Sequence, residues 1–319
     1  MSKIKIVVCD SPFPSLDPAK EALARLDPIV VQAKSASAED ILAEAKDADG
    51  ILVTYAKLPG DLLRQCKKLK VIGRFGLGVD NIDIPAAKEL GIVVTYVPDY
   101  CLHEVSDHAM ALLLSIARKI PLANTSVQSG EWKMPVVVPL RRFNTQTLGL
   151  IGFGGIPRSL APKAQSFGFK VIASDPFLPK EMFDAAKVES VTLDELYARS
   201  DLISVHAPLM PQTRGLVNDD AFAKMKQGVM IVNTARGPLI DEDALVRALD
   251  SGKVAAAGLD VVTTEPLPKD SKLLGRGNVV ITPHTGFYSV EALLELETKC
   301  AKDVASVLSG EKPVYPVKM

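Results

Sequence analysis

The sequence is poor in several features that would each point to a class of protein. Its cysteines lie far apart, without a C-x-x-C pair or zinc-ligand spacing, so we expect free thiols and no metal site. Its basic and acidic residues balance, 37 against 38, and no long basic run is present, which argues against a nucleic-acid surface. No apolar run approaches the roughly 18 residues of a membrane span, and the N-terminus shows no signal peptide. We therefore expect a cytoplasmic protein that binds neither nucleic acid nor membranes.

Short apolar segments alternate with helical ones along most of the 319 residues. A chain of this length suggests two domains. The expected strands of the first half are 4–9, 29–31, 50–54, 71–73 and 92–96. Those of the second half lie near 148–151, 170–173, 202–206, 229–233, 256–259 and 279–282. Such alternation predicts an α/β fold with two doubly wound parallel-sheet domains.

The segments between and after these sheets set the domain limits. Apolar residues recur at helical spacing over 102–120, which predicts one long connector helix, and an extended surface arm is expected at 130–142. The last helical pattern, from Ser289 to about Leu308, has no strand after it. We therefore expect it to return to the first domain. The predicted domains are 1–102 plus 287–319, and 103–286.

A glycine-rich turn opens the second half. Gly152, Gly154 and Gly155 come directly after the apolar run 148–151 and before a helical pattern. At such a junction the free backbone N–H groups and the positive helix end can face a phosphate. Pro157 stands where the third glycine of the motif belongs, although proline is tolerated in a first helical turn. A tight turn without a ligand is the alternative interpretation.

An acidic residue follows the next expected strand. Strand 170–173 ends in Ser174-Asp175, which lies 23 residues after Gly152. A carboxylate there can accept both ribose hydroxyls of NAD and would repel the 2′-phosphate of NADP. Strand, turn, helix, strand and acid in this order favour NAD binding.

The sequence has four histidines that could act in acid–base catalysis. His103 and His108 belong to the connector helix, where structural or surface roles are expected. His206 closes a strand and could line the adenine–ribose side of the pocket or act as the acid–base group. His284 follows strand 279–282 at a sheet end, where ligands bind in such folds. An imidazole there can donate a proton to a developing alkoxide.

Two charged residues at other strand ends complete a candidate catalytic group. Glu265 comes after strand 256–259 and could orient the imidazole, with a solvated loop acid as the alternative. Arg236 comes just past strand 229–233, where a guanidinium fork could bind a carboxylate and polarise a carbonyl. An exposed surface arginine is the alternative there.

Together these blocks resemble the D-isomer-specific 2-hydroxyacid dehydrogenase family along essentially the whole chain. The matching blocks are Gly73–Asp83, the glycine turn with Asp175, Asn233–Gly237, Gly258–Pro266 and Thr282–Gly286. The resemblance implies a flavodoxin-like substrate domain, a Rossmann NAD-binding domain and a catalytic trio of Arg236, Glu265 and His284. It also implies dimerisation through the connector helix and the arm.

The resemblance implies the ligand contacts as well. Backbone N–H groups of Leu77 and Gly78 are expected to hold the substrate carboxylate. Besides the glycine turn, NAD contacts are implied at Gly155, Ile156, Asp175, Ala207, Thr234, Ala235 and Asp260. Many relatives carry an arginine at the position of Gly155, and Arg158 is a candidate to replace its phosphate contact.

The substrate expected from the resemblance is a small 2-hydroxy or 2-oxo acid of the glyoxylate or hydroxypyruvate type. The 3-phosphoglycerate dehydrogenases are an alternative, because Arg74 matches a cationic position near their substrate. However, Thr54 and Tyr55 stand where those enzymes usually have an arginine for the phosphate. A second alternative is an NAD-sensing corepressor similar to the C-terminal-binding proteins, which the blocks 97–100 and 287–289 resemble most.

Overall fold

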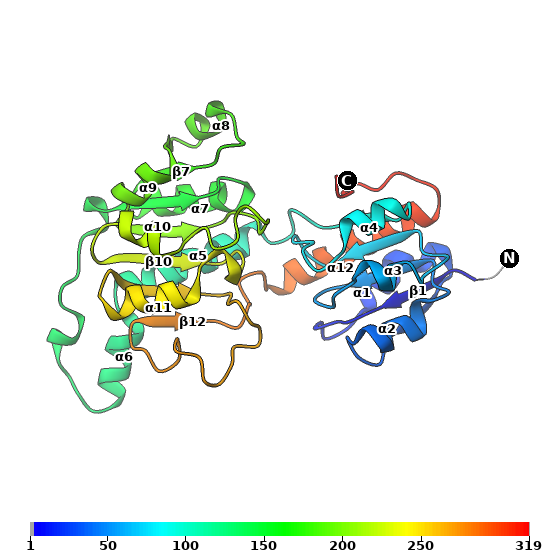
Figure 1. The fold of residues 1–319 in the computed structure, drawn as a ribbon, viewed down its shortest axis with the longest axis horizontal. Helices are drawn as coiled ribbons and strands as arrows, with labels where there is room; N and C mark the ends of the chain where they lie inside the picture. The colour runs from blue at the N-terminus through cyan, green and yellow to red at the C-terminus, as the bar shows by residue number, and fades with distance from the viewer. Residues whose placement is uncertain (1–2, 319) are drawn as a thin grey trace. The chain divides into compact units, whose positions relative to one another are not determined.

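The computed structural model describes residues 3–318 and divides the chain into two compact units. One unit combines the chain up to Cys101 with the segment from Ser289 onward, and the other comprises Leu102–Tyr288 (Figure 1). Each unit is built on its own parallel sheet with helices packed against it. The predicted α/β class with two doubly wound parallel-sheet domains is therefore confirmed.

The first unit has a five-stranded sheet in the order β2-β1-β3-β4-β5. Its strands are β1 Lys5–Val8, β2 Ile29–Gln32, β3 Gly50–Val53, β4 Val71–Arg74 and β5 Val93–Thr95. The helices are α1 Asp17–Leu23, α2 Ala38–Ala45, α3 Gly60–Leu63, α4 Ile84–Glu89 and α12 Val290–Leu308. Every residue of β3 and β4 is buried, as expected for central strands with both faces covered. The late helix α12 packs on α1 and β4, which makes this unit discontinuous in sequence.

The second unit has a seven-stranded sheet in the order β12-β11-β10-β9-β6-β7-β8. Its strands are β6 Thr147–Ile151, β7 Lys170–Ser174, β8 Glu189–Ser190, β9 Leu202–Val205, β10 Val229–Asn233, β11 Val254–Leu259 and β12 Val279–Ile281. The strand order reverses between β6 and β9. Ligands of open α/β sheets bind beyond the carboxyl ends of the strands at such a reversal.

The helices of the second unit are α5 Leu102–Ala117, α6 Ile120–Gln128, α7 Gly155–Ser166, α8 Lys180–Ala185, α9 Leu193–Arg199, α10 Asp219–Lys224 and α11 Glu242–Asp250. They mostly pack along its sheet, whereas α6 packs on α5 and α8 on the edge strand β8 (Figure 1). Buried side chains fill the space between helices and sheet, and Phe153 stacks on Phe183 with ring centroids 4.7 Å apart. Each fully buried leucine, isoleucine or phenylalanine contributes about 1.5–3 kcal/mol relative to an exposed one. The strand ends, which carry the candidate site, therefore sit on a rigid base.

The prediction of a single connector helix over 102–120 is wrong. Helix α5 ends at Ala117, and α6 begins at Ile120 with a proline in its first turn. Pro121 has no backbone N–H and clashes with a preceding helical turn, so the ladder of α5 cannot continue through it. Lys119 makes the break with a left-handed backbone, φ 53°. The expected arm at 130–142 contains a short 3₁₀ helix, Met134–Val137.

None of the helices within residues 3–318 combines the length and the apolarity that crossing a bilayer requires.

Candidate active site

The three residues predicted as catalytic lie at the carboxyl ends of adjacent strands. Arg236 follows β10, Glu265 follows β11 and His284 follows β12, and these strands are neighbours in the sheet. Backbone hydrogen bonds tie the ends together, because Asp260 N–H donates to the carbonyl of Asn233 at 3.0 Å and His284 N–H donates to that of Asp260 at 2.8 Å. Residues far apart in sequence therefore converge at one edge of the sheet.

The imidazole of His284 is paired with the carboxylate of Glu265. The distance from Nδ1 to Oε2 is 2.7 Å, and the other oxygen of Glu265 accepts the N–H of Val262 at 3.1 Å. Burial by itself would raise the pKa of Glu265. The hydrogen bond from His284, the N–H of Val262 and the charge of Arg236 outweigh that effect and lower the pKa below its ordinary value. The carboxylate is thus ionised at neutral pH and holds the ring by Nδ1.

The loop that carries Arg236 is shaped by Asn233, which is 1% exposed. Its amide Nδ2 donates to the carbonyl of Arg236 at 2.8 Å, and its Oδ1 accepts the N–H of Ala235 at 3.0 Å. The guanidinium donates to the carbonyl of Ala235 at 2.8 Å and is close enough to Glu265 to lower the pKa of that carboxyl. Sequence reasoning missed Asn233, because an asparagine at a strand end has many possible uses.

The turn at His284 depends on Asp260. His284 has a left-handed backbone, φ 54°, which is unusual for a residue other than glycine. The carboxylate of Asp260 accepts the N–H groups of Thr285 at 2.9 Å and Gly286 at 2.8 Å. Asp260 was predicted only as an NAD contact. Its side chain is 3% exposed and is committed to holding the residues after His284, a role that the sequence did not reveal.

The other histidines are placed differently. His206 bonds to Ser204 Oγ through Nε2 at 2.8 Å, and desolvation lowers its pKa to about 3. It therefore stays neutral near pH 7 and cannot serve as the proton donor there. His103 is exposed at the start of α5. His108 contacts Thr282 and Asp260 inside the second unit.

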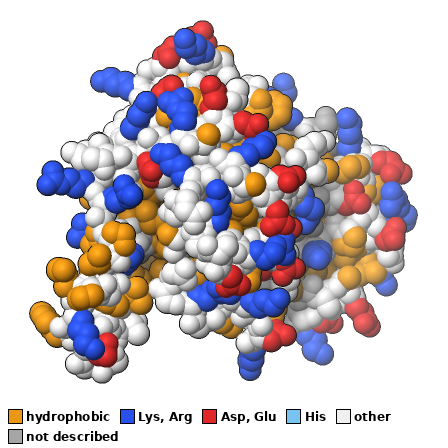
Figure 2. Space-filling model, turned by 60° about the vertical axis from the view of Figure 1, so that its left-hand side comes forward, with side chains coloured by type: hydrophobic (Ala, Val, Ile, Leu, Met, Phe, Trp, Pro, Cys, Tyr) orange, Lys and Arg blue, Asp and Glu red, His pale blue; other side chains and the backbone are white. Residues whose placement is uncertain are grey.

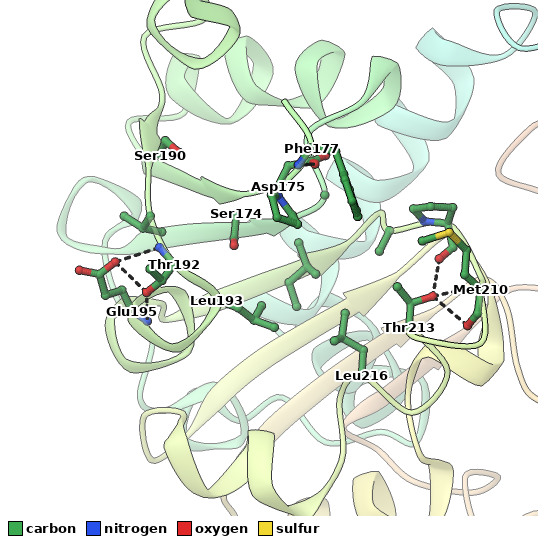
Figure 3. Close-up of a pocket in the computed structure, with 16 residues that line it drawn as sticks. Ser174, Asp175, Phe177, Ser190, Thr192, Leu193, Glu195, Met210, Thr213 and Leu216 are labelled. Carbon is green, nitrogen blue, oxygen red and sulfur yellow. Dashed lines mark hydrogen bonds between the residues drawn. The ribbon is translucent and has the colours of Figure 1, made fainter. Parts of the chain in front are cut away.

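A cavity of about 640 Å³ lies beyond the ends of β6, β7 and β9 (Figure 3). Of the predicted NAD contacts, Gly152, Asp175 and Ala207 line it. Asp175 accepts the N–H of Phe153 at 2.9 Å through one oxygen and the N–H of Phe177 at 3.0 Å through the other. These two bonds fix the carboxylate in place before any ligand binds.

Much of the cavity lining consists of apolar side chains that the sequence analysis did not single out. They include Phe177, Val191, Leu193, Met210 and Leu216. Phe177 is 82% exposed and lies two residues after Asp175, so an aromatic residue at that spacing was a usable signal. Met210 and Leu216 carried no such signal in the sequence, because they belong to the segment between β9 and α10, far along the chain from Asp175.

The glycine turn has the geometry that a phosphate site needs. Gly152 has φ 86°, and a Cβ there would lie 3.0 Å from the backbone of His206 and Ala207, so any side chain at this position would be strained. Helix α7 starts at Gly155, and Pro157 lies in its first turn, where the missing N–H has no intrahelical partner. The side chain of Arg158 donates to the carbonyl of Gly154 at 3.1 Å, which holds this cation beside the turn.

These features fit a dinucleotide. The cavity offers an apolar wall for a ring and an acid for hydroxyl groups. Gly152, which lines it, leads within three residues to the N-terminus of α7, where phosphates can bind. Thr234, which does not line this cavity, has a buried hydroxyl that finds no hydrogen-bond partner within residues 3–318. An unpaired buried hydroxyl is costly, so a ligand group that bonds to it would bind favourably. No cluster of three or more potential metal ligands occurs in the same residues.

The predicted substrate loop belongs to the first unit. Leu77, which is 39% exposed, and Gly78 lie in the loop after β4. Arg74, just before them, is 8% exposed and donates to the carbonyl of Phe75 at 3.0 Å. The neighbouring turn after β3 is held by the carboxylate of Asp10, which accepts the N–H of Thr54 at 2.8 Å.

Comparison with known families identifies the second unit. Residues 110–286 match the family model described as the D-isomer specific 2-hydroxyacid dehydrogenase, NAD binding domain. The matched segment contains the glycine turn, Asp175 and all three predicted catalytic residues.

Comparison with individual proteins extends over nearly the whole chain. The D-3-phosphoglycerate dehydrogenase of Methanocaldococcus jannaschii is 41% identical over 99% of this chain, which spans 60% of that relative's length. The structure of a glyoxylate reductase from Paecilomyes thermophila superposes with a TM-score of 0.90 at 32% identity and covers 99% of both chains. A D-lactate dehydrogenase from Aquifex aeolicus, complexed with NAD and lactic acid, gives 0.87 at 30% identity over 96% of both chains.

Proposed function

The chain belongs to the D-isomer-specific 2-hydroxyacid dehydrogenase family, and we propose that it is an NAD-dependent oxidoreductase that interconverts a D-2-hydroxy acid and its 2-oxo acid. The observation that carries this proposal is the 2.7 Å contact between His284 and Glu265 at a strand end of the NAD-binding unit. A histidine oriented by a carboxylate is the arrangement that proton transfer to a carbonyl oxygen needs.

The proposed mechanism assigns one task to each residue of the trio. When bound, NADH supplies a hydride to the carbonyl carbon. His284 presents Nε2–H to the carbonyl oxygen, because its Nδ1 is held by Glu265, and it delivers the proton as the alkoxide forms. Glu265 stabilises the imidazolium, and Arg236 binds the carboxylate and polarises the carbonyl. In oxidation, neutral His284 accepts the proton from the hydroxyl.

The remaining proposed contacts divide between cofactor and substrate. For the cofactor they are Gly152, Gly154, Gly155, Ile156, Asp175, Ala207, Thr234, Ala235 and Asp260. Backbone N–H groups of Leu77 and Gly78 are proposed to hold the substrate carboxylate. Asp175 supports NAD over NADP, because a second anion would meet its carboxylate and none of the described residues lining the cavity is a lysine or arginine.

A small, uncharged substrate of the glyoxylate or hydroxypyruvate type is proposed. Two features of the first unit support it. The guanidinium of Arg74 is largely buried and bonds to Phe75, and the turn at Thr54 and Tyr55 is already bound to the carboxylate of Asp10. A carboxylate at that turn disfavours a phosphate beside it.

Oxidation of 3-phosphoglycerate is the second candidate, favoured by the 41% identity with the Methanocaldococcus jannaschii enzyme. The two candidates separate in one experiment. NADH consumption is followed with glyoxylate, hydroxypyruvate, pyruvate, longer 2-oxo acids and phosphohydroxypyruvate. The highest kcat/KM is expected for glyoxylate or hydroxypyruvate. Preference for phosphohydroxypyruvate would support the second candidate, and no turnover with any of them would contradict both.

We also propose a homodimer formed through α5, α6 and the arm that follows, and a cytoplasmic location. Figure 2 shows hydrophobic side chains gathered on the part of the second unit that carries α6. Exposed apolar residues there are Ile120, Val127, Trp132, Met134 and Val138. A patch of this kind on a globular protein commonly marks an interface. All four cysteines are buried free thiols, which supports a reducing compartment.

A further inference from the structure

We propose that His108, on helix α5, is a positioning residue that holds His284 in its working orientation through Thr282 and Asp260. This proposal goes beyond the catalytic trio and depends on the proposed role of His284 as proton donor. All four residues lie in the second unit.

A hydrogen-bond relay connects His108 to Asp260. Nε2 of His108 lies 2.8 Å from the hydroxyl of Thr282 and 3.3 Å from Oδ1 of Asp260. The Thr282 hydroxyl donates to Oδ1 of Asp260 at 2.6 Å. A hydroxyl has one proton, so towards His108 it can only accept. The proton of His108 is therefore on Nε2, and the imidazole acts as the donor of the relay.

Asp260, which the relay holds in place, in turn fixes the backbone turn that carries His284. Three successive N–H groups bond to this one residue. His284 donates to its carbonyl at 2.8 Å, Thr285 to Oδ1 at 2.9 Å and Gly286 to Oδ2 at 2.8 Å. A left-handed residue such as His284 is held only when its surroundings determine its backbone. Rotation of the Asp260 carboxylate would release the N–H groups of Thr285 and Gly286 and loosen the backbone turn that carries the imidazole, leaving the contact with Glu265 to hold the ring.

The packing around the relay is tight. A Cβ on Gly286 would lie 2.8 Å from Oδ2 of Asp260 and 3.3 Å from Cδ2 of His108, so the turn lies directly against the imidazole. Helix α5 packs on β10 and β11, and its Leu112 and Leu113 are buried. His108 therefore acts from a rigid base, as a supporting group must if it is to orient a catalytic side chain.

The charge of Asp260 makes each donor matter. Burial by itself would raise the pKa of its carboxyl. The bonds from His108, Thr282, Thr285 and Gly286 outweigh that effect and lower the pKa. An ionised carboxylate that is 3% exposed needs its full set of donors. Removing the imidazole would take two contacts from the relay at once.

A kinetic test compares His108→Ala with His108→Gln, because the glutamine amide can donate from a similar position. For the alanine variant we expect kcat to fall about tenfold, which is the usual effect of removing a group that orients a functional residue by a hydrogen bond. KM for the 2-oxo acid should stay unchanged. The glutamine variant and Thr282→Ser should recover most of kcat, and Thr282→Val should match the alanine variant. Unchanged kcat in His108→Ala, or a glutamine variant as slow as the alanine one, would overturn the proposal.

A second measurement needs no substrate. Amide hydrogen exchange at residues 284–286 is followed by NMR in the full chain, with His103→Ala, an exposed position on the same helix, as control. We expect these amides to exchange about tenfold faster in His108→Ala than in wild type. In the control and in His108→Gln they should exchange at the wild-type rate. Unchanged exchange in His108→Ala overturns the positioning role. If these amides exchange faster in His108→Ala but the wild type reduces no 2-oxo acid, the relay is supported and the proposed function is contradicted.

Discussion

Nδ1 of His284 lies 2.7 Å from Oε2 of Glu265, while Oε1 of the same carboxylate accepts the N–H of Val262. Both oxygens of Glu265 are thus used, one to fix the acid in its loop and one to fix the imidazole. The ring can turn only by losing that bond. The pair therefore defines which nitrogen of His284 faces the substrate in the proposed reaction.

Replacing Glu265 by glutamine should slow the chemical step. The variant keeps the shape but removes the charge that stabilises the imidazolium, so we expect kcat to fall about 10- to 100-fold. The measurement is NADH oxidation in the steady state with the preferred 2-oxo acid. Glu181→Gln, which changes an exposed glutamate at the start of α8, is the matched control and should behave as wild type. A Glu265→Gln variant as fast as this control would show that the pairing does not matter for turnover.

The pKa of Glu265 also predicts the behaviour at acid pH. Since the folded protein lowers this pKa, the ionised pair adds stability above the ordinary carboxyl pKa, and that contribution is lost as the pH falls through the lowered value. The wild type should keep the pair intact to a lower pH than an ordinary glutamate would allow. Thermal unfolding of wild type and Glu265→Gln over the acid range checks this. The melting temperatures of the two proteins should converge at the lowest pH, and a difference in melting temperature that stays constant with pH would contradict the expectation.

Asp175 should decide between the two nicotinamide dinucleotides. In Asp175→Asn the charge that repels a 2′-phosphate is gone, and one ribose acceptor is lost. We expect the Kd for NADH to rise roughly tenfold, the scale of one charged hydrogen bond, while NADPH binding improves. Fluorescence titration with both nucleotides measures the ratio. Glu195→Gln changes another carboxylate of the same cavity, which bonds to Thr192, and should leave the ratio unchanged. A ratio unaffected by Asp175→Asn would exclude it as the selector.

Glu297, in the middle of α12, should make the first unit less stable at alkaline pH. It is 3% exposed, and one of its oxygens has no hydrogen-bond partner within residues 3–318. Desolvation raises its pKa to about 7, with a further rise from Asp17 and an opposing bond from the N–H of Ala19. Because the folded pKa is raised, the protonated form contributes stability below the ordinary carboxyl pKa, and this is lost as the pH rises through about 7.

Glu297→Gln should remove that loss. At about pH 8 the variant should be more stable than wild type by on the order of 2–3 kcal/mol, and at about pH 5 the two should be similar. Urea unfolding at both pH values, followed by circular dichroism, is the measurement. A wild type that is equally stable at both values would show that the carboxyl titrates normally.

The proposed homodimer predicts the effect of charge in the arm. Trp132 is 89% exposed and Met134 is 74% exposed. An aspartate at Trp132 would bury a charge in the interface, so we expect Trp132→Asp to shift the sedimenting mass from dimer to monomer. Val314→Asp, at a position that is 72% exposed in the first unit, should remain a dimer. A wild type that sediments as a monomer at micromolar concentration would contradict the proposal.

Much of the fold was accessible from sequence because buried parallel strands are short, apolar and regularly spaced. The strand from Val229 to Asn233 has the predicted limits, and α12 begins one residue after the predicted Ser289. Strand β8 was not predicted, since two exposed residues, Glu189 and Ser190, carry no apolar pattern. The break between α5 and α6 was missed because apolar periodicity continues to Ile120 across Lys119. Periodicity reports which face is buried, whereas the break depends on the backbone demand of Pro121.

Part of the candidate site could likewise be predicted from the sequence, and part of it could not. Arg236, Glu265 and His284 could be selected because charged or titratable residues after successive strands must meet at one sheet edge. Their catalytic role stays a prediction. The relay through His108 could not be foreseen, because His108 and Thr282 are 174 residues apart and meet only through the packing of α5 on the sheet. Nothing in the local sequence of α5 distinguishes that histidine from a surface one.

We propose that His284 is the proton donor of a 2-oxo acid reductase. The most direct test is the single-turnover rate of NADH oxidation by wild type and His284→Ala with the preferred 2-oxo acid, together with the Kd for NADH of each. We expect a rate about 100-fold or more lower in the variant, with NADH binding retained. Equal rates in the two proteins would contradict it.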